Sequence, residues 1–292
     1  MKKILIFTTA CISFCACKKD SDSNSNPSPA PVSNSCLLTE VRDSSGNRVT
    51  SSYEYNANRK LLKENKYSNG VLSGYSTYSY NGNTLTIQDY KTNNQADGSP
   101  AIGILNASGY LTSLVSSGPD TIEGTPGIAK DTGSFNYNSS GQMQSYTLRS
   151  WTRDAGNTVL NWFSITVNFE YNAGRATKIT SSFNSTRGSL TENSSSVDVY
   201  TYNENSPIVK SNPAIGFFFL AGTELLGKPV SDRIPVKSDE TYTDIEGNSS
   251  NGIKTFSAII DSKGYPTKIR TRSDLGGGSF FSTTTQYTYT CP

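Results

Sequence analysis

The fold of this chain is decided by a stretch that alternates and then turns, FSITVNFEYNAG, residues 163–174. Every second residue in it is apolar or aromatic: Phe163, Ile165, Val167, Phe169 and Tyr171. In an extended strand these residues share one face, and the residues between them share the other. Asn172-Ala173-Gly174 follows, and Asn and Gly tolerate the positive φ angles of tight hairpins. The stretch therefore predicts one arm of a β-hairpin with a buried side and a water-facing side.

The same unit recurs along the chain, as an apolar or aromatic residue, then Asn or Asp, then a short turn that usually contains Gly. The instances are Tyr55–Asn58, Tyr80–Asn83, Leu105–Gly109, Tyr137–Gly141, Tyr171–Gly174, Tyr202–Asn205 and Ile260–Gly264. Alternating residues flank these turns, which is a hairpin signal. We therefore predict an all-β domain over 36–292, an antiparallel meander of about a dozen strands or more. A sheet that long should curl into an open or closed barrel-like form, because exposed edges are a liability.

One segment departs from this pattern. Ser211-Asn212-Pro213 is typical of a helix start, with a capping side chain followed by proline. An apolar run follows and ends before Gly222. The run is too short to span a bilayer, so we expect one short helix near 213–221 that packs on an end of the sheet.

The strand and turn at 169–179 resemble the YD repeats of RHS-type shell proteins, with Asn172 in place of Asp and one turn residue fewer. Over residues 36–291 the layout resembles a family of Bacteroidota-type surface lipoproteins of unknown function. That resemblance implies a porin-like or curled β-meander fold, and it brings no catalytic residues with it.

The N-terminus predicts export. Met1-Lys2-Lys3 is basic, residues 4–14 are mostly apolar, and Phe14-Cys15-Ala16-Cys17 resembles a bacterial lipobox. The resemblance implies a signal peptide at 1–16 and lipidation of Cys17. The alternative is an ordinary signal peptide cut elsewhere, with Cys17 incidental. Residues 17–35 are rich in Ser, Asn and Pro and predict a flexible linker.

The linker also bears on location. Charged residues directly after Cys17 resemble those of surface lipoproteins, which implies an outer-membrane anchor and exposure at the cell surface. A periplasm-facing lipoprotein is the alternative. The predicted partners are therefore the membrane, through the lipid on Cys17, and a glycan or an envelope protein.

Five cysteines are present, and cleavage before Cys17 would remove Cys11 and Cys15. Lipidation would use Cys17, which leaves Cys36 and Cys291 at the two ends of the domain. An oxidising compartment and a leftover pair favour a disulfide between them. Two free buried thiols are the alternative.

Composition excludes several functions. The chain has no histidine, so it holds no catalytic histidine and no histidine-ligated metal. Cleavage before Cys17 would reduce the 26 basic residues to 24, equal to the 24 acidic ones, so nothing recommends nucleic acid as a partner. Hydrophobic residues make up only 34%, but 17 Tyr and 12 Phe can still supply a core. We expect no cofactor and no metal.

Trp151 and Trp162 are the only tryptophans and the candidate ligand-binding residues, because exposed indoles can stack on sugar rings. Ordinary packing is the alternative for both. The sequence favours a non-enzymatic binding or scaffold module in the cell envelope. A carbohydrate-active enzyme with paired carboxylates is the competing class. A transmembrane barrel is a third, although the strands alternate toward Ser, Thr and Asn where lipid would require aliphatic residues.

Overall fold

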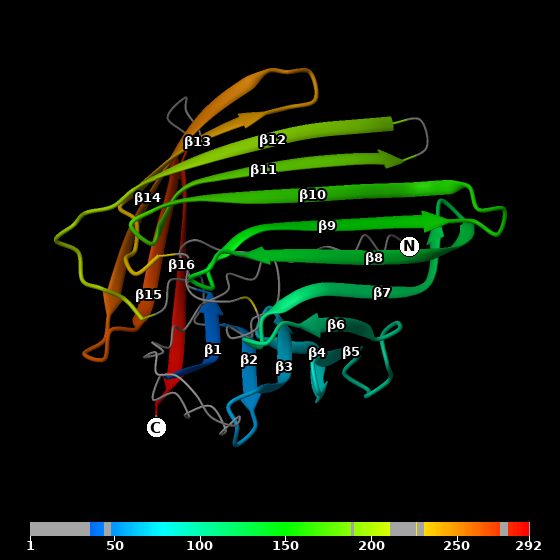
Figure 1. Ribbon diagram of the computed structural model, residues 1–292, viewed down its shortest axis with the longest axis horizontal. Coiled ribbons are helices and arrows are strands. Elements are labelled where there is room, and N and C mark those ends of the chain that lie inside the picture. The colour runs from blue at the N-terminus through cyan, green and yellow to red at the C-terminus, as the bar shows by residue number, and fades with distance from the viewer. Residues whose placement is uncertain are drawn as a thin grey trace.

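The computed structural model describes residues 36–43, 48–187, 190–210, 226, 231–274 and 280–291. These residues form a closed antiparallel barrel of 16 strands, in which neighbours along the chain are neighbours in the sheet (Figure 1). The strands are β1 (Leu37–Asp43), β2 (Val49–Tyr55), β3 (Leu61–Ser68), β4 (Val71–Asn81), β5 (Thr84–Tyr90), β6 (Ala101–Leu105), β7 (Leu111–Ile122), β8 (Thr125–Tyr137), β9 (Met143–Arg153), β10 (Val159–Asn172), β11 (Arg175–Arg187), β12 (Leu190–Thr201), β13 (Lys237–Thr243), β14 (Ser249–Ile260), β15 (Pro266–Asp274) and β16 (Phe280–Thr290).

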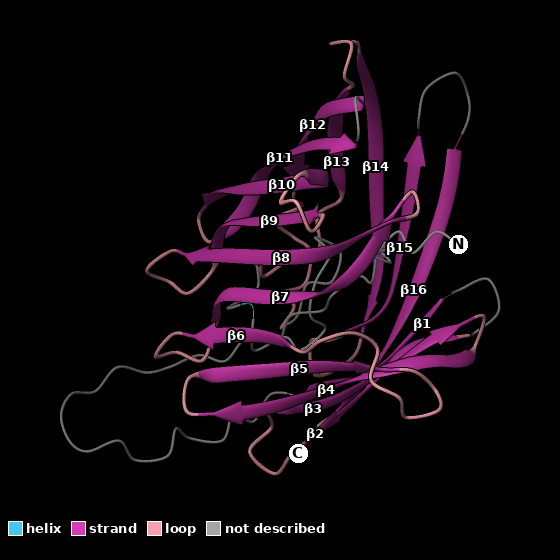
Figure 2. Cartoon of the chain, turned by 90° about the vertical axis from the view of Figure 1, so that its right-hand side faces the viewer, coloured by secondary structure: helices cyan, strands magenta, loops and turns pink. Residues whose placement is uncertain are grey.

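The predicted all-β meander is thus confirmed, and it closes. The short helix expected near 213–221 lies outside the described residues, as do the signal peptide at 1–16 and the linker at 17–35. Within the described ranges, the chain forms no helix of the length and apolarity needed to cross a membrane. The walls of the barrel run at different inclinations: β7–β10 lie side by side, and β14–β16 run steeply across their direction (Figure 2).

Closure joins the two ends of the domain. β1 pairs with β16, with Leu38 opposite Tyr289 and Val41 opposite Tyr287. A disulfide links Cys36, just before β1, to Cys291, just after β16. The predicted bridge is therefore confirmed, and Cys36 is 3% exposed.

One end of the barrel, where β2, β4 and every later even-numbered strand ends, is here called the base. At the base, the tyrosine and the asparagine of the repeat make different contacts. In several turns the Asn or Asp side-chain oxygen accepts a backbone N–H four residues on: Asn56, Asn106, Asn138 and Asp261. The tyrosine hydroxyls donate to a backbone carbonyl at the start of the neighbouring strand: Tyr55 to Leu38, Tyr137 to Leu111, Tyr171 to Met143 and Tyr202 to Ala176. The repeat thus both shapes the hairpins and ties adjacent strands together at the base.

We expect Tyr171→Phe to lower the free energy of unfolding by about 1–3 kcal/mol, because it leaves the buried carbonyl of Met143 without its donor. Urea denaturation of the whole chain measures the change. Tyr242→Phe is the control, since the Tyr242 side chain is exposed. Equal stability of Tyr171→Phe and Tyr242→Phe would show that the hydroxyl contact does not support the fold.

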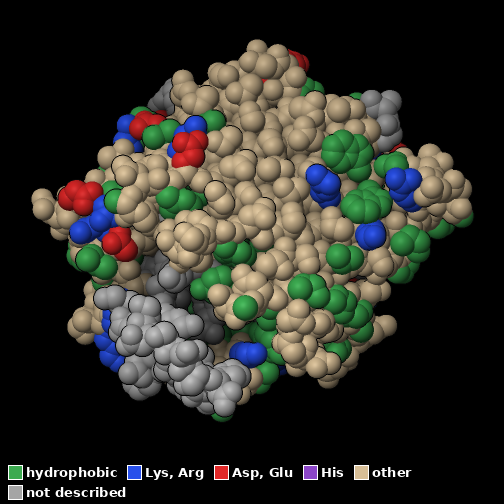
Figure 3. Space-filling model, in the orientation of Figure 1, with side chains coloured by type: hydrophobic (Ala, Val, Ile, Leu, Met, Phe, Trp, Pro, Cys, Tyr) green, Lys and Arg blue, Asp and Glu red, His purple; other side chains and the backbone are tan. Residues whose placement is uncertain are grey.

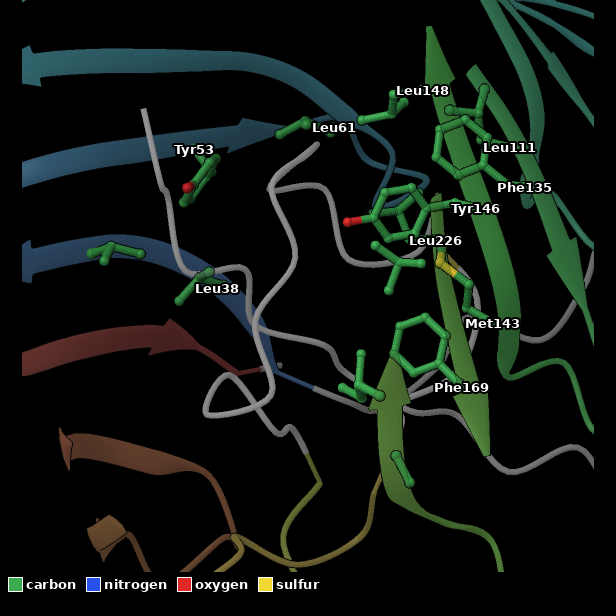
Figure 4. Packing of buried hydrophobic residues seen from close by; sticks show 14 of the residues in the cluster. Leu38, Tyr53, Leu61, Leu111, Phe135, Met143, Tyr146, Leu148, Phe169 and Leu226 are labelled. Atoms are coloured by element: carbon green, nitrogen blue, oxygen red, sulfur yellow. The ribbon is translucent and has the colours of Figure 1, made fainter. Parts of the chain in front are cut away.

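The core fills the base and not the opposite end, here called the mouth. Inward residues near the base are large and almost fully buried, such as Leu85, Leu111 and Met143. The connection between β12 and β13 enters this core, because Leu226 lies among Tyr146, Met143 and Phe169 (Figure 4). Toward the mouth the inward positions of β7, β11 and β12 are mostly small, polar and half-buried. The barrel is therefore packed shut at one end.

The outward face of β10 is polar between Ser164 and Glu170. Val167 and Phe169 fix the inner face of β10, so the alternate positions face outward, and from Ser164 to Glu170 they carry Ser, Thr, Asn and Glu. A barrel wall in contact with lipid needs an apolar outward band about 25 Å tall. This outward face of β10 therefore fits water and does not fit the hydrocarbon of a bilayer.

Candidate functional site

The two tryptophans lie next to each other on the outer wall. Trp151 of β9 and Trp162 of β10 are directly opposite in the strand register. Side chains at opposite positions have Cβ atoms about 4.5–5.5 Å apart, so the two tryptophans are direct neighbours on the wall. Both face outward, because Leu148 and Val167 fix the inner faces of the two strands. Both are half-buried, so part of each indole is accessible.

Two cations border the tryptophan pair. The Lys130 Nζ lies 5.7 Å from the ring centroid of Trp151, a distance at which a cation and an aromatic ring attract. Arg149 lies two residues before Trp151 on the same outward face and is exposed. We call Lys130, Arg149, Trp151 and Trp162 the tryptophan patch.

Figure 3 shows how the side-chain types are distributed over the face that carries β8–β10. Over the ends of β8–β10 toward the mouth, hydrophobic side chains mix with Lys and Arg (Figure 3). The Asp and Glu of this view gather on the opposite, left-hand side. Much of the remaining surface in this view is neither charged nor hydrophobic.

In a second aromatic pair on the outer wall, the two rings stack on each other. Tyr75 and Tyr90 stack on each other with centroids 4.9 Å apart, and the Lys63 Nζ lies 4.4 Å from the Tyr75 centroid. The Tyr75 hydroxyl also donates to Asn94. Trp162, by contrast, has no cation or aromatic ring against it within the described part of the chain. The Trp162 ring is therefore available in the tryptophan patch, whereas Lys130 lies over Trp151 and both rings of the tyrosine pair are engaged.

The inner wall holds a charged network that the sequence did not indicate. The Lys66 Nζ lies 2.9 Å from a carboxylate oxygen of Asp89, which also accepts from the Ser76 hydroxyl. Next to this group, Tyr78 donates to the buried Glu64 over 3.1 Å. Burial raises the pKa of Glu64, and nearby Lys66 opposes that rise only in part. The Tyr78 hydroxyl is fully enclosed, and burial first and Glu64 second raise its pKa.

A second inner network spans β12–β14. The Lys254 Nζ lies 3.0 Å from Glu240 and 3.4 Å from Asp198, and Ser238 donates to Asp198. Glycoside hydrolysis needs one carboxylic acid and one carboxylate free to act on the sugar. Here both carboxylates are turned toward one ammonium group, so the network is better suited to holding the wall together than to acid–base chemistry. Among the described residues, no group of three or more Asp, Glu or Cys could hold a metal ion.

We expect Glu64→Gln to change how stability depends on pH. A raised pKa in the folded state means that the folded protein binds the proton more tightly, so the free energy of unfolding falls as pH rises above about 4.5. The amide that Glu64→Gln introduces would still accept from Tyr78 and would not ionise. The advantage of Glu64→Gln over the natural chain should therefore grow with pH.

Urea denaturation at several pH values between 4 and 8 tests this, with Glu192→Gln as the control on an exposed carboxylate. A difference between Glu64→Gln and the natural chain that stays constant with pH would contradict the expected burial effect.

The structure brings together the two tryptophans that the sequence singled out separately. It also joins Cys36 to Cys291, whereas Cys17 lies outside the described residues. Lys130 and Arg149 were missed. Their signal was available, because Trp151 and Trp162 flank the hairpin loop at 154–158 almost symmetrically, and the strand before it places Lys130 opposite Trp151.

Comparison with solved structures identifies similar folds. A porin-like protein from Bacteroides vulgatus ATCC 8482 matches with a TM-score of 0.54 at 16% identity, over 87% of this chain and 99% of the other. A porin-like protein from Bacteroides uniformis ATCC 8492 matches with a TM-score of 0.50 at 16% identity, over 86% and 95%. No family model matches, and no curated protein matches. The chain thus has a porin-like fold, in agreement with the fold that the sequence resemblance implied.

Proposed function

We propose that this chain is a lipid-anchored, non-enzymatic binding module of the outer membrane, which stands at the cell surface and holds a glycan on its tryptophan patch. The observation that carries the proposal is the adjacency of Trp151 and Trp162 on the outer wall. Paired indoles offer flat apolar faces that suit the apolar faces of sugar rings. The hydroxyl and amide side chains around them suit the hydroxyl groups of a saccharide.

The direction of the tether supports this arrangement. The linker at 17–35 joins the barrel just before β1, and β1 begins at the base beside Cys36 and Cys291. Trp151 is close to the end of β9 at the mouth, and Trp162 is close to the start of β10. A lipid on Cys17 would therefore be tethered to the barrel at its base, the end opposite to the patch.

The outer wall and the packed base also favour binding over transport. The outward faces of β10 and β11 carry mainly Ser, Thr and Asn, which do not suit lipid contact. Leu226, Val209 and Ile234 from the connection between β12 and β13 lie in the core that fills the base. The porin-like fold is therefore used here, in our proposal, as a closed scaffold that displays a surface.

A glycan array with the full chain carrying Cys17→Ser, which prevents lipidation, tests the proposal. We expect binding to one or more glycans, and Trp151→Ala/Trp162→Ala should weaken it by at least about tenfold, because buried Trp anchors contribute about 2 kcal/mol or more. Tyr75→Ala/Tyr90→Ala is the matched control, as it removes another outward aromatic pair and should leave binding unchanged.

Two results would overturn the proposal. One is an array without binding, joined to a pull-down that retains no envelope partner. The other is equal binding by the tryptophan variant and the tyrosine control.

A further inference from the structure

We propose that the ligand of the tryptophan patch is an acidic polysaccharide, bound through its carboxylate or sulfate groups by Lys130 and Arg149. This inference rests on the proposed function. Lys130 is opposite Trp151 in the register of β8 and β9, and Arg149 is opposite Thr132 on the same outward side. Lys130 thus lies in the same row as the two tryptophans and Arg149 lies in the next row, so that both cations border the indoles.

Neither cation is neutralised by a carboxylate. Lys130 and Arg149 take part in no ion pair within the described part of the chain. Among the outward positions of β8 to β10, from Ile128 to Glu170, the single carboxylate is Glu170, which pairs with Lys178 near the base at 2.7 Å. The patch is therefore a positive area that a ligand can complement.

The acids of the same wall face inward. Asp131 lies next to Lys130 in the chain, yet its carboxylate accepts from Ser116 on the inner side of β7. Asp120 likewise accepts from the buried Thr152. In this part of the wall the acidic side chains thus face the interior of the barrel, and the basic side chains face outward. Such an arrangement attracts an anion to the outer face. It gives a neutral ligand no advantage over another polar surface.

An anionic lipid surface has the same charge and also favours exposed Trp beside Lys and Arg. The position of the patch argues against it. The patch lies toward the mouth, whereas the linker leaves from the base. A strand of the length of β10, 14 residues, extends over about 45 Å, so the patch lies far from the point where the linker attaches.

Matched pairs of polymers test the inference with the full chain carrying Cys17→Ser. Each pair has one backbone in a charged and a neutral form: polygalacturonate with its full methyl ester, and chondroitin sulfate with its desulfated, carboxyl-reduced form. We expect the charged member to bind about tenfold more tightly at low salt and to lose that advantage at high salt. Lys130→Met/Arg149→Gln should abolish the difference, so that the charged member binds no more tightly than the neutral member at either salt concentration.

The outcomes separate the two proposals. Equal, salt-independent binding of charged and neutral members would overturn the acidic ligand and keep the glycan site. Binding to neither member of any pair, together with an array without binding, would overturn both. Binding to phosphatidylglycerol vesicles that needs Trp151 and Trp162, without binding to any polysaccharide, would assign the patch to a lipid surface and overturn the inference.

Discussion

Replacing Cys36 and Cys291 together by serine is expected to lower the free energy of unfolding by about 5 kcal/mol, the loss that the chain-entropy model gives for so long a loop. The bridge spans 255 residues, so nearly the whole domain is closed into one ring. Removing it lets the unfolded chain expand, while β1 and β16 remain paired in the folded state. For a domain of this size the melting temperature should fall by about 10–20 °C.

Thermal and urea denaturation with and without reductant measure this effect. The natural chain in reductant should approach the stability of the Cys36→Ser/Cys291→Ser variant, and reductant should not affect that variant. A loss below about 1 kcal/mol would show that the bridge restrains the unfolded chain little, as happens when the unfolded state keeps residual structure.

The disulfide also shows which features of the fold could be predicted from the sequence and which could not. The pairing of Cys36 with Cys291 follows from counting cysteines after export, and it implies that the ends of the sheet meet. Whether the sheet closes was left open, because closure depends on the register of β1 against β16, which no local pattern determines. The hairpins, by contrast, depend on residues within each turn, and so their positions were predictable.

The charged residues of the inner wall could not be predicted from the sequence, for a related reason. Glu64 lies in the strand LLKENKYS, which does not alternate, so nothing marked it as inward. Its burial results from the pairing of β3 with β2 and β4, which places Glu64 opposite Tyr53 and Ser76. The tryptophan patch has the same origin. Each tryptophan was visible alone, but the register of β8, β9 and β10 brings Lys130, Trp151 and Trp162 into one row.

Phe169→Ala is expected to lower the free energy of unfolding by about 3–5 kcal/mol, the usual cost of removing a buried phenyl ring. Phe169 is 5% exposed and packs in the base beside Met143 and Leu226 (Figure 4). Its loss leaves a cavity where β9, β10 and the connection between β12 and β13 meet. Asn168→Ala is the control on the outward face of the same strand and should change stability by no more than about 0.5 kcal/mol.

A second substitution, Phe163→Ala, tests whether the core is packed more tightly at the base than at the mouth. Phe163 lies on the same strand and the same inward face, but toward the mouth, where it stacks on Phe183 at 6.3 Å and is only half-buried. Its removal should cost about 1–2 kcal/mol, since less apolar area returns to water and a solvated mouth leaves no closed cavity. Equal losses for Phe163→Ala and Phe169→Ala in urea denaturation would mean that the mouth is packed like the base. A clearly smaller loss for Phe163→Ala would locate the stability of the barrel at the end where the tether attaches, so that the mouth can carry a binding surface at little cost to the fold.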